Sequence, residues 1–164
     1  MSITFRRATR ENLPELVRMN QQLIIDEQSH NRMSETELAQ RMHDWLDGGR
    51  HALLIVRAGE IIGYMLYYRS DDEFYPYQNS IYVRQYFIKN SYRRRGIGQE
   101  AFRQIVAEYF PPEAAITLDV VASNIAARQF WERIGFAPYH VSMRREADIE
   151  AAQTATESEY SAQL

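Results

Sequence analysis

The chain has 164 residues, of which 45% are hydrophobic, with a formal net charge of −3 and no cysteine. This length allows one domain with a hydrophobic core, and no run approaches the roughly 20 apolar residues of a membrane span. The lack of cysteine excludes disulfides, thiolate metal sites and a cysteine nucleophile. The acidic total argues against a general nucleic-acid binder, and the N-terminus lacks a secretory apolar core. We therefore expect a cytoplasmic protein without a nucleic-acid or membrane partner.

Hydrophobic periodicity and turn residues predict alternating strands and helices along most of the chain. The first half of the chain is expected to form a strand at 3–7, a helix over 13–24, and a second helix that begins at the capping box Ser34–Glu37 and ends at Gly48-Gly49. A hairpin of 52–56 with 61–68 and a strand at 80–89 follow. The second half is expected to form a helix from Ile97 that Pro111 stops, a strand at 115–121, a helix that ends at Gly135, and a last strand at 139–144.

The predicted order is β-α-α-β-β-β-α-β-α-β. Alternation in the second half implies at least one parallel strand pair, so the fold class is α/β with a mixed sheet flanked by helices. We find no repeat, low-complexity tract or linker. The sequence predicts one domain over residues 1–146, followed by a tail over 147–164 that is small, polar and acidic.

The segment Tyr92-Arg93-Arg94-Arg95-Gly96-Ile97-Gly98 joins an apolar strand to a helix and carries the strongest functional signal. A strand that feeds a glycine-containing turn at a helix N-terminus directs backbone N–H groups at an anion. A diphosphate fits this pattern, and a solvated arginine cluster is the alternative. The segment has neither the three glycines of a Rossmann first turn nor the Gly-Lys-Ser/Thr of a P-loop.

Two motifs in this chain resemble those of the GNAT acyl-CoA N-acyltransferase family. The first is Arg93-x-x-Gly96-x-Gly98, after the strand that ends in Tyr86-Phe87-Ile88. The second is Asn124-x-x-Ala127-x-x-Phe130-Trp131-x-x-x-Gly135-Phe136, with Leu118 and Val120 on the strand before it. The order of elements also resembles that of the family from residue 3 to about 145.

The resemblance implies that the strands ending near Ile88 and near Val121 splay apart and hold acetyl-CoA between them. Backbone N–H groups of residues 93–98 would hold the pyrophosphate, and main-chain groups of Phe87 and Ile88 would pair with the pantetheine arm. An N–H near Ile88 would stabilise the oxyanion. The residues expected to bind the cofactor are Phe87, Ile88, Arg93, Arg94, Arg95, Gly96, Ile97, Gly98, Asn124 and Trp131. Asn124 fits equally well as a plain helix N-cap.

Two residue types that the family often uses for catalysis are missing here. Trp131 stands where many members carry a tyrosine that protonates the thiolate, and Arg84-Gln85 stands where a glutamate base is frequent. Tyr86 and Tyr82 are the candidate catalytic tyrosines, which we expect to share a face of their strand. Packing on the sheet is the simpler interpretation of both.

Acidic and polar residues in two loops are candidates for the acceptor site. Glu27, as a further catalytic candidate, and His30 lie between the first two helices, where the family builds its acceptor pocket. Glu73 lies in the acidic loop Asp71-Asp72-Glu73. These carboxylates would attract a cation, although a solvated surface role is common for such residues.

The leading hypothesis is an N-acetyltransferase that moves acetyl from acetyl-CoA to a primary amine of a cationic small molecule, by direct attack in a ternary complex and without a metal. A protein or peptide amine is a variant. A catalytically silent acyl-CoA binding or sensing module is the alternative, because both expected catalytic residues are absent. The family resemblance also allows a homodimer.

Overall fold

The computed structural model describes residues 2–71 and 79–147, and its contacts divide the chain into the units Met1–Ile134 and Gly135–Leu164. The first unit contains a five-stranded sheet in the order β1-β2-β3-β4-β5. The strands are β1 (Ile3–Arg7), β2 (His51–Arg57), β3 (Glu60–Ser70), β4 (Ser80–Ile88) and β5 (Ala115–Thr117). All neighbours are antiparallel except β4 and β5, which are parallel, so the predicted mixed sheet is confirmed.

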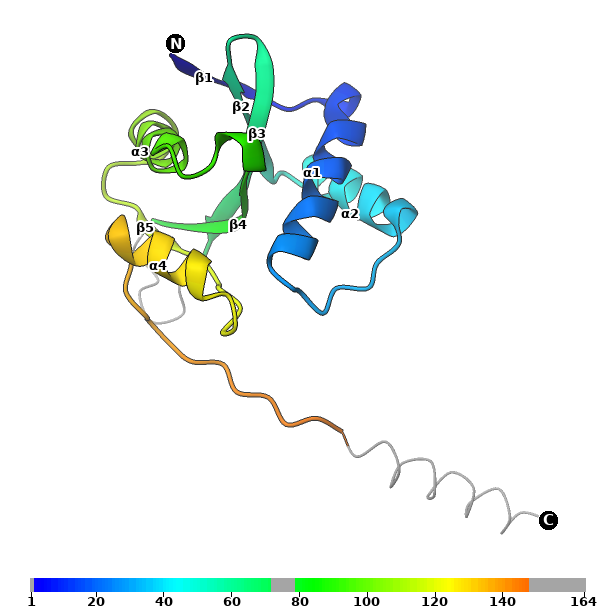
Figure 1. Ribbon diagram of the computed structural model, residues 1–164, viewed down its shortest axis with the longest axis vertical. Helices are drawn as coiled ribbons and strands as arrows, with labels where there is room; N and C mark the ends of the chain where they lie inside the picture. Colours follow the sequence, from blue (N-terminus) through cyan, green and yellow to red (C-terminus); the bar gives the residue numbers. More distant parts are fainter. Residues whose placement is uncertain (1, 72–78, 148–164) are drawn as a thin grey trace, which may run out of the picture. The chain divides into compact units, whose positions relative to one another are not determined.

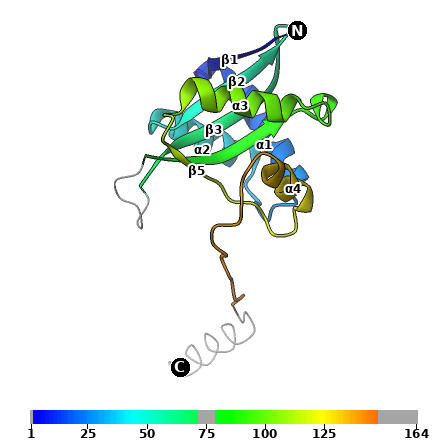
Figure 2. The same ribbon diagram turned by 90° about the vertical axis from the view of Figure 1, so that its left-hand side faces the viewer.

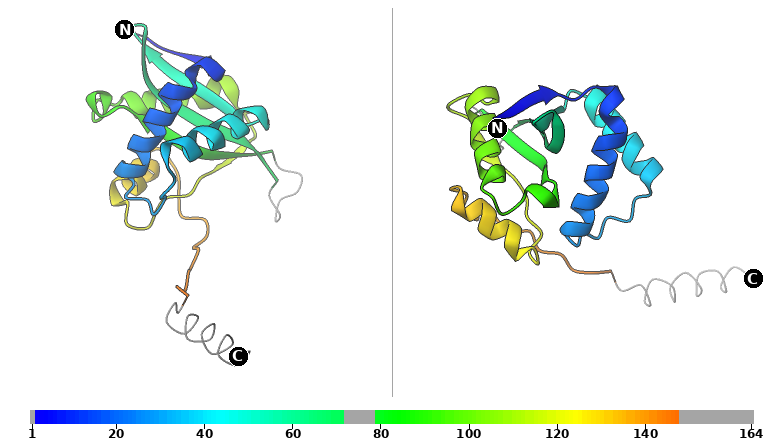
Figure 3. Two further views of the ribbon diagram at one scale, coloured as in Figure 1. Left: turned by 90° about the vertical axis from the view of Figure 1, so that its right-hand side faces the viewer. Right: turned by 45° about the horizontal axis from the view of Figure 1, so that its top comes forward.

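Helices lie on both faces of this sheet (Figure 1). The helices are α1 (Leu13–Asp26), α2 (Glu35–Asp47), α3 (Ile97–Tyr109) and α4 (Ile125–Arg133), with short 3-10 turns at Arg10–Asn12 and Asn90–Tyr92. One side view shows α3 in front of the strands (Figure 2), and the opposite view shows α1 and α2 (Figure 3). The α/β class is therefore confirmed. No helix in the described ranges is long and apolar enough to cross a membrane.

Local sequence signals account for the ends of several elements. The Ser34 side chain accepts from the Glu37 N–H at 3.3 Å, and the Glu37 carboxylate accepts from the Ser34 N–H at 2.7 Å, which is the predicted capping box. Ala58 and Gly59 have φ of 52° and 80°, as the tight turn between β2 and β3 requires. The core on the α1/α2 face then packs Leu16, Met19, Leu23, Met42, Ala52, Leu54, Tyr64, Leu66 and Phe87.

A β-bulge in β4 corrects one expectation. Leu66 pairs with Gln85 and the next residue, Tyr67, pairs with Val83, so Arg84 has no partner on β3. An extra residue reverses the alternation of side chains beyond it. Tyr82 and Tyr86 therefore lie on opposite faces of the sheet, and the expectation that they share a face is wrong.

The C-terminal part of the expected order is also corrected. Strand β5 ends at Thr117, so Leu118 and Val120 do not lie on it. Residues 137–147 contain no helix or strand, and the strand expected at 139–144 is not formed. Its alternating apolar residues Tyr139, Val141 and Met143 are 62–91% exposed. A strand needs a partner for its backbone groups, and alternation alone does not supply one. Apart from residue 147, the expected tail lies outside the described residues.

Candidate functional site

The site is organised by two parallel strands that pair only briefly. Strands β4 and β5 pair from Ser80–Ala115 to Tyr82–Thr117, whereas β4 continues to Ile88. Beyond Tyr82, the β5-facing edge of β4 therefore has no strand partner among the described residues. This early end of the pairing fits the separation of strands that the family resemblance implies, and it leaves alternate main-chain groups along residues 83–88 without a strand partner in the described part of the chain.

The direction of those groups follows from two contacts with β3. The Lys89 N–H donates to the Ile62 carbonyl on β3 at 2.8 Å. A methyl group on Gly63 would lie 2.1 Å from the Phe87 carbonyl oxygen, so that carbonyl also faces β3. Because backbone groups alternate along a strand, the N–H groups of Ile88 and Tyr86 point to the opposite, open edge. The Ile88 N–H, which is the expected oxyanion donor, therefore points to this open edge, and its role in catalysis stays a prediction.

The turn after β4 presents a run of backbone donors. Arg94 and Gly96 have φ of 59° and 75°, both in the left-handed region, and α3 begins directly after them. Within the described residues, no backbone hydrogen bond uses the N–H groups of residues 94 to 98. Successive N–H groups curled in this way at a helix N-terminus form an anion site. The predicted pyrophosphate loop thus has the required donors.

The side chains of the three arginines in this turn have different roles. The Arg93 Nε donates to the Ile88 carbonyl oxygen at 2.6 Å, and its Nη2 pairs with the Asp26 carboxylate at the end of α1. The Arg93 N–H donates to the Asn90 carbonyl oxygen. Arg93 therefore anchors the turn to β4 and α1, while the exposed Arg94 and Arg95 are left to contact an anion.

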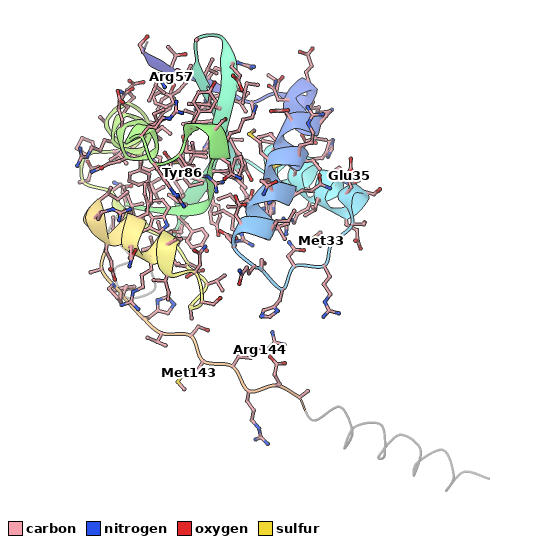
Figure 4. The ribbon with its side chains drawn as sticks, viewed as in Figure 1. Met33, Glu35, Arg57, Tyr86, Met143 and Arg144 are labelled. Atoms are coloured by element: carbon pink, nitrogen blue, oxygen red, sulfur yellow. The ribbon has the colours of Figure 1, made fainter. Side chains whose placement is uncertain are left out.

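Tyr86 lies on the α3 face of β4 (labelled in Figure 4), inside an aromatic cluster with Phe102, Phe130 and Trp131. Its hydroxyl donates to the Gly98 carbonyl oxygen at 2.6 Å, at the start of α3. Burial raises the pKa of Tyr86, which makes its hydroxyl a poorer acid. These contacts indicate that the Tyr86 side chain supports the turn after β4, and they do not favour a role in proton transfer. The Trp131 ring belongs to the same cluster, 5.7 Å from the Tyr86 ring centroid.

Tyr82 is placed on the other face, opposite Tyr68 of β3. Its hydroxyl donates to the Asp119 carboxylate at 2.6 Å. Burial first, and then this hydrogen bond, raise the pKa of Tyr82. The two candidate tyrosines are therefore not brought together, and each hydroxyl already has an acceptor.

Asn124 caps α4, since its side-chain oxygen accepts from the Ala127 N–H at 3.1 Å. The N-cap interpretation is thus confirmed, and it leaves the side-chain amide of Asn124 as a donor.

Gly98 is not crowded by its neighbours, because a methyl group there would lie 3.5 Å from Phe130 and 3.6 Å from Ile88.

The residues expected in the acceptor site are only partly described. Glu27 follows α1 and is half-buried, and burial raises the pKa of its carboxyl group while the positive charge of Arg84 opposes that shift. His30 lies exposed in the connection to α2. Glu73 lies outside the described residues. No cluster of three or more potential metal-binding side chains occurs within the described ranges.

Sequence analysis missed a polar cluster on the α1/α2 face of the sheet. The side chains of Arg41, Arg50 and Arg84 surround the Trp45 ring. These residues come from α2, from the connection before β2, and from the β4 bulge. The hydroxyl of Tyr64 donates to the buried Gln85 amide beneath them, at 2.9 Å. Arg41 and Arg50 are near Trp45 in sequence, but Arg84 comes from a distant strand, and no local motif predicts that contact.

Comparison with known proteins agrees with this geometry. The model of the Acetyltransferase (GNAT) family matches residues 17–136. Similar solved structures include a possible acetyltransferase from Clostridium difficile 630, with 16% identity, a TM-score of 0.72, and coverage of 90% of this chain and 98% of that one. A predicted acetyltransferase with acetyl-CoA from Clostridium acetobutylicum has 16% identity, a TM-score of 0.70, and coverage of 88% and 96%.

A ribosomal-protein-alanine N-acetyltransferase from Brucella melitensis biovar Abortus 2308 has 14% identity, a TM-score of 0.64, and coverage of 89% and 100%. No curated protein matches the chain in sequence. At these sequence identities the structural neighbours show only that the fold is the same. The family model matches most of the chain and therefore shows the family. The diverging strands, the donor-rich turn and this match together show that the chain belongs to the Acetyltransferase (GNAT) family.

Proposed function

We propose that the protein is an N-acetyltransferase that transfers acetyl from acetyl-CoA to the primary amine of a small molecule, by direct attack in a ternary complex. The observation that carries this proposal is the open edge of β4, where the Ile88 N–H lies next to a turn with free donors at residues 94–98. Acetyl-CoA would supply the activated acetyl thioester.

The residues of this chain fit the groups of acetyl-CoA in order. The N–H groups of residues 94–98, with Arg94 and Arg95 beside them, would hold the pyrophosphate. The open edge of β4 would pair with the amides of the pantetheine arm, as an added strand does. The Ile88 N–H would then polarise the thioester carbonyl and stabilise the negative charge that develops on its oxygen.

Glu27 is the proposed group for orienting the amine and accepting its proton, directly or through water. A carboxylate with a raised pKa is a stronger base than an exposed one, so burial suits Glu27 to this role. The attacking nitrogen forms a bond to the carbonyl carbon, and the carbon–sulfur bond breaks. The described contacts assign no acid to the leaving thiolate, since the hydroxyls of Tyr82 and Tyr86 donate elsewhere.

The test is to incubate the protein with acetyl-CoA and a panel of amines while free thiol is recorded, and to measure CoA binding by calorimetry. We expect saturable CoA binding and thiol release that depends on one class of amine. CoA binding without thiol release for any amine would instead support the sensing module, for which Gln85 and Trp131 in place of the frequent family residues are the supporting observation. Release only with protein or peptide amines would exclude a small-molecule acceptor.

A further inference from the structure

Three arginines gather around one indole ring on the α1/α2 face of the sheet. The guanidinium carbons of Arg41, Arg50 and Arg84 lie 4.4, 5.1 and 5.6 Å from the centroid of the Trp45 ring. Arg50 also lies 5.0 Å from the Tyr68 ring centroid. Cation–π contacts with the aromatic rings favour each guanidinium individually, but they do not neutralise its charge.

Among the carboxylates of the described residues, none forms an ion pair with these three arginines, although nine such contacts exist elsewhere. Burial first, and then the charge of Arg84, lower the pKa of Arg41, so the positive charges act on one another.

Buried donors without acceptors lie beside this cluster. Asn20 is 1% exposed, and its side-chain oxygen accepts from Arg41 Nη2 at 3.0 Å. The Nδ2 of Asn20 and the Nε of Arg41 are buried without a hydrogen-bond partner among the described residues. Buried polar groups are normally satisfied, so this face has an excess of donors over acceptors.

The cluster adjoins the groups proposed to receive the acceptor amine. Arg84 lies at the β4 bulge, and its positive charge acts on the Glu27 carboxylate. The charges of Glu27, Arg41 and Arg84 all act on the buried Tyr64. One molecule could therefore place an ammonium or amine at Glu27 and an oxyanion at the guanidiniums. Arginine is well suited to the second task, because its planar fork matches carboxylate and phosphate oxygens.

We propose that the acceptor is a zwitterionic small molecule whose amine is acetylated and whose carboxylate or phosphate is bound by Arg84, Arg50 and Arg41. This inference rests on the proposed function and names its substrate class. It differs from the purely cationic acceptor that the acidic loops favour, because three guanidiniums gather around Trp45 in addition to the Glu27 carboxylate.

Matched amine pairs test the proposal. Lysine with 1,5-diaminopentane and tyrosine with tyramine differ by a carboxylate, and O-phosphoethanolamine with ethanolamine differs by a phosphate. We expect kcat/KM, from thiol release, to be about 10- to 100-fold higher for the anionic member of at least one pair, as for a charged hydrogen bond. The pair that shows the preference identifies the oxyanion as carboxylate or phosphate.

Variants assign that preference to the cluster. In Arg84→Gln the preference should fall to about threefold or less, whereas Arg84→Lys should keep part of it, because the charge stays and the fork is lost. Arg84 is exposed, so neither change should impair folding. Arg103→Gln, at an exposed position on α3 on the other face, is the matched control and should match the wild type.

The outcomes separate the two proposals. Thiol release that is equal for both members of every pair, or a preference that Arg84→Gln leaves intact, would overturn the zwitterionic acceptor while the acetyltransferase stands. Absence of thiol release with every amine, despite CoA binding, would overturn the proposed function instead.

Discussion

Replacement of Gly96 by alanine tests the assignment of the turn after β4. Gly96 has φ of 75°, and a methyl group there would meet nothing within 4 Å. The cost is therefore conformational and not steric, about 1–2 kcal/mol for a non-glycine residue in the left-handed region. If the turn relaxes to avoid this cost, its N–H groups move, and CoA must restore them on binding. We expect CoA to bind about 5- to 30-fold more weakly, which is the same free energy expressed as a ratio.

Gly59 provides a matched control for this change. It has φ of 80° in the turn between β2 and β3, and a methyl group there would also meet nothing within 4 Å. Both variants should lose about 1–2 kcal/mol in free energy of unfolding, but Gly59→Ala should bind CoA as the wild type does. Calorimetric titrations with CoA at one fixed salt concentration measure the difference. Equal CoA affinity in the two variants would refute the pyrophosphate assignment.

Three further changes address individual side chains. Tyr86→Phe removes the donor to the Gly98 carbonyl oxygen, and should cost roughly 1 kcal/mol in urea unfolding with kcat within about threefold of wild type; a hundredfold loss of kcat would give this hydroxyl a catalytic role. Arg93→Ala leaves the Ile88 carbonyl oxygen and the Asp26 carboxylate without the donors that Arg93 supplies. We expect a loss of roughly 1–3 kcal/mol in free energy of unfolding and weaker CoA binding. Unchanged CoA affinity would argue against an anchoring role for Arg93. Because burial raises the pKa of Glu27, the folded protein binds this proton more tightly than the unfolded chain, and stability falls as pH rises through the raised pKa. Glu27→Gln should therefore be more stable than wild type in urea at pH 8, with the difference lost below about pH 4, and should turn over more slowly; equal stability at both values would contradict the buried carboxylate.

The parts of the fold that were predictable depend on local signals. The capping box at Ser34, the hairpin at Ala58-Gly59 and the strand–turn–helix at Gly96 each need only neighbouring residues, and each is present. The two family motifs also identified the family, which the match of the family model confirms. These signals act over three to seven residues, so no knowledge of tertiary contacts was necessary.

The parts that were not predictable depend on distant contacts or on an irregularity. The bulge at Arg84 has no compositional mark, yet it moves Tyr82 to the face opposite Tyr86. The contact of Arg84 with Trp45 joins β4 to α2 across about forty residues of sequence. The alternation at 139–144 is a sound strand pattern, but a strand forms only where a partner supplies its hydrogen bonds.

The bulge connects the two halves of the proposed reaction. Beyond it, Tyr86 lies against α3 and supports the turn that would hold the pyrophosphate. At it, Arg84 lies by Trp45 on the face that would receive the acceptor. In a regular strand Tyr82 would share the face of Tyr86 and would not reach Tyr68 on the acceptor side. In the proposed reaction, this one extra residue would let a single strand bind acetyl-CoA with its main-chain edge and the acceptor with its side chains, so both substrates would meet at the same few residues of β4.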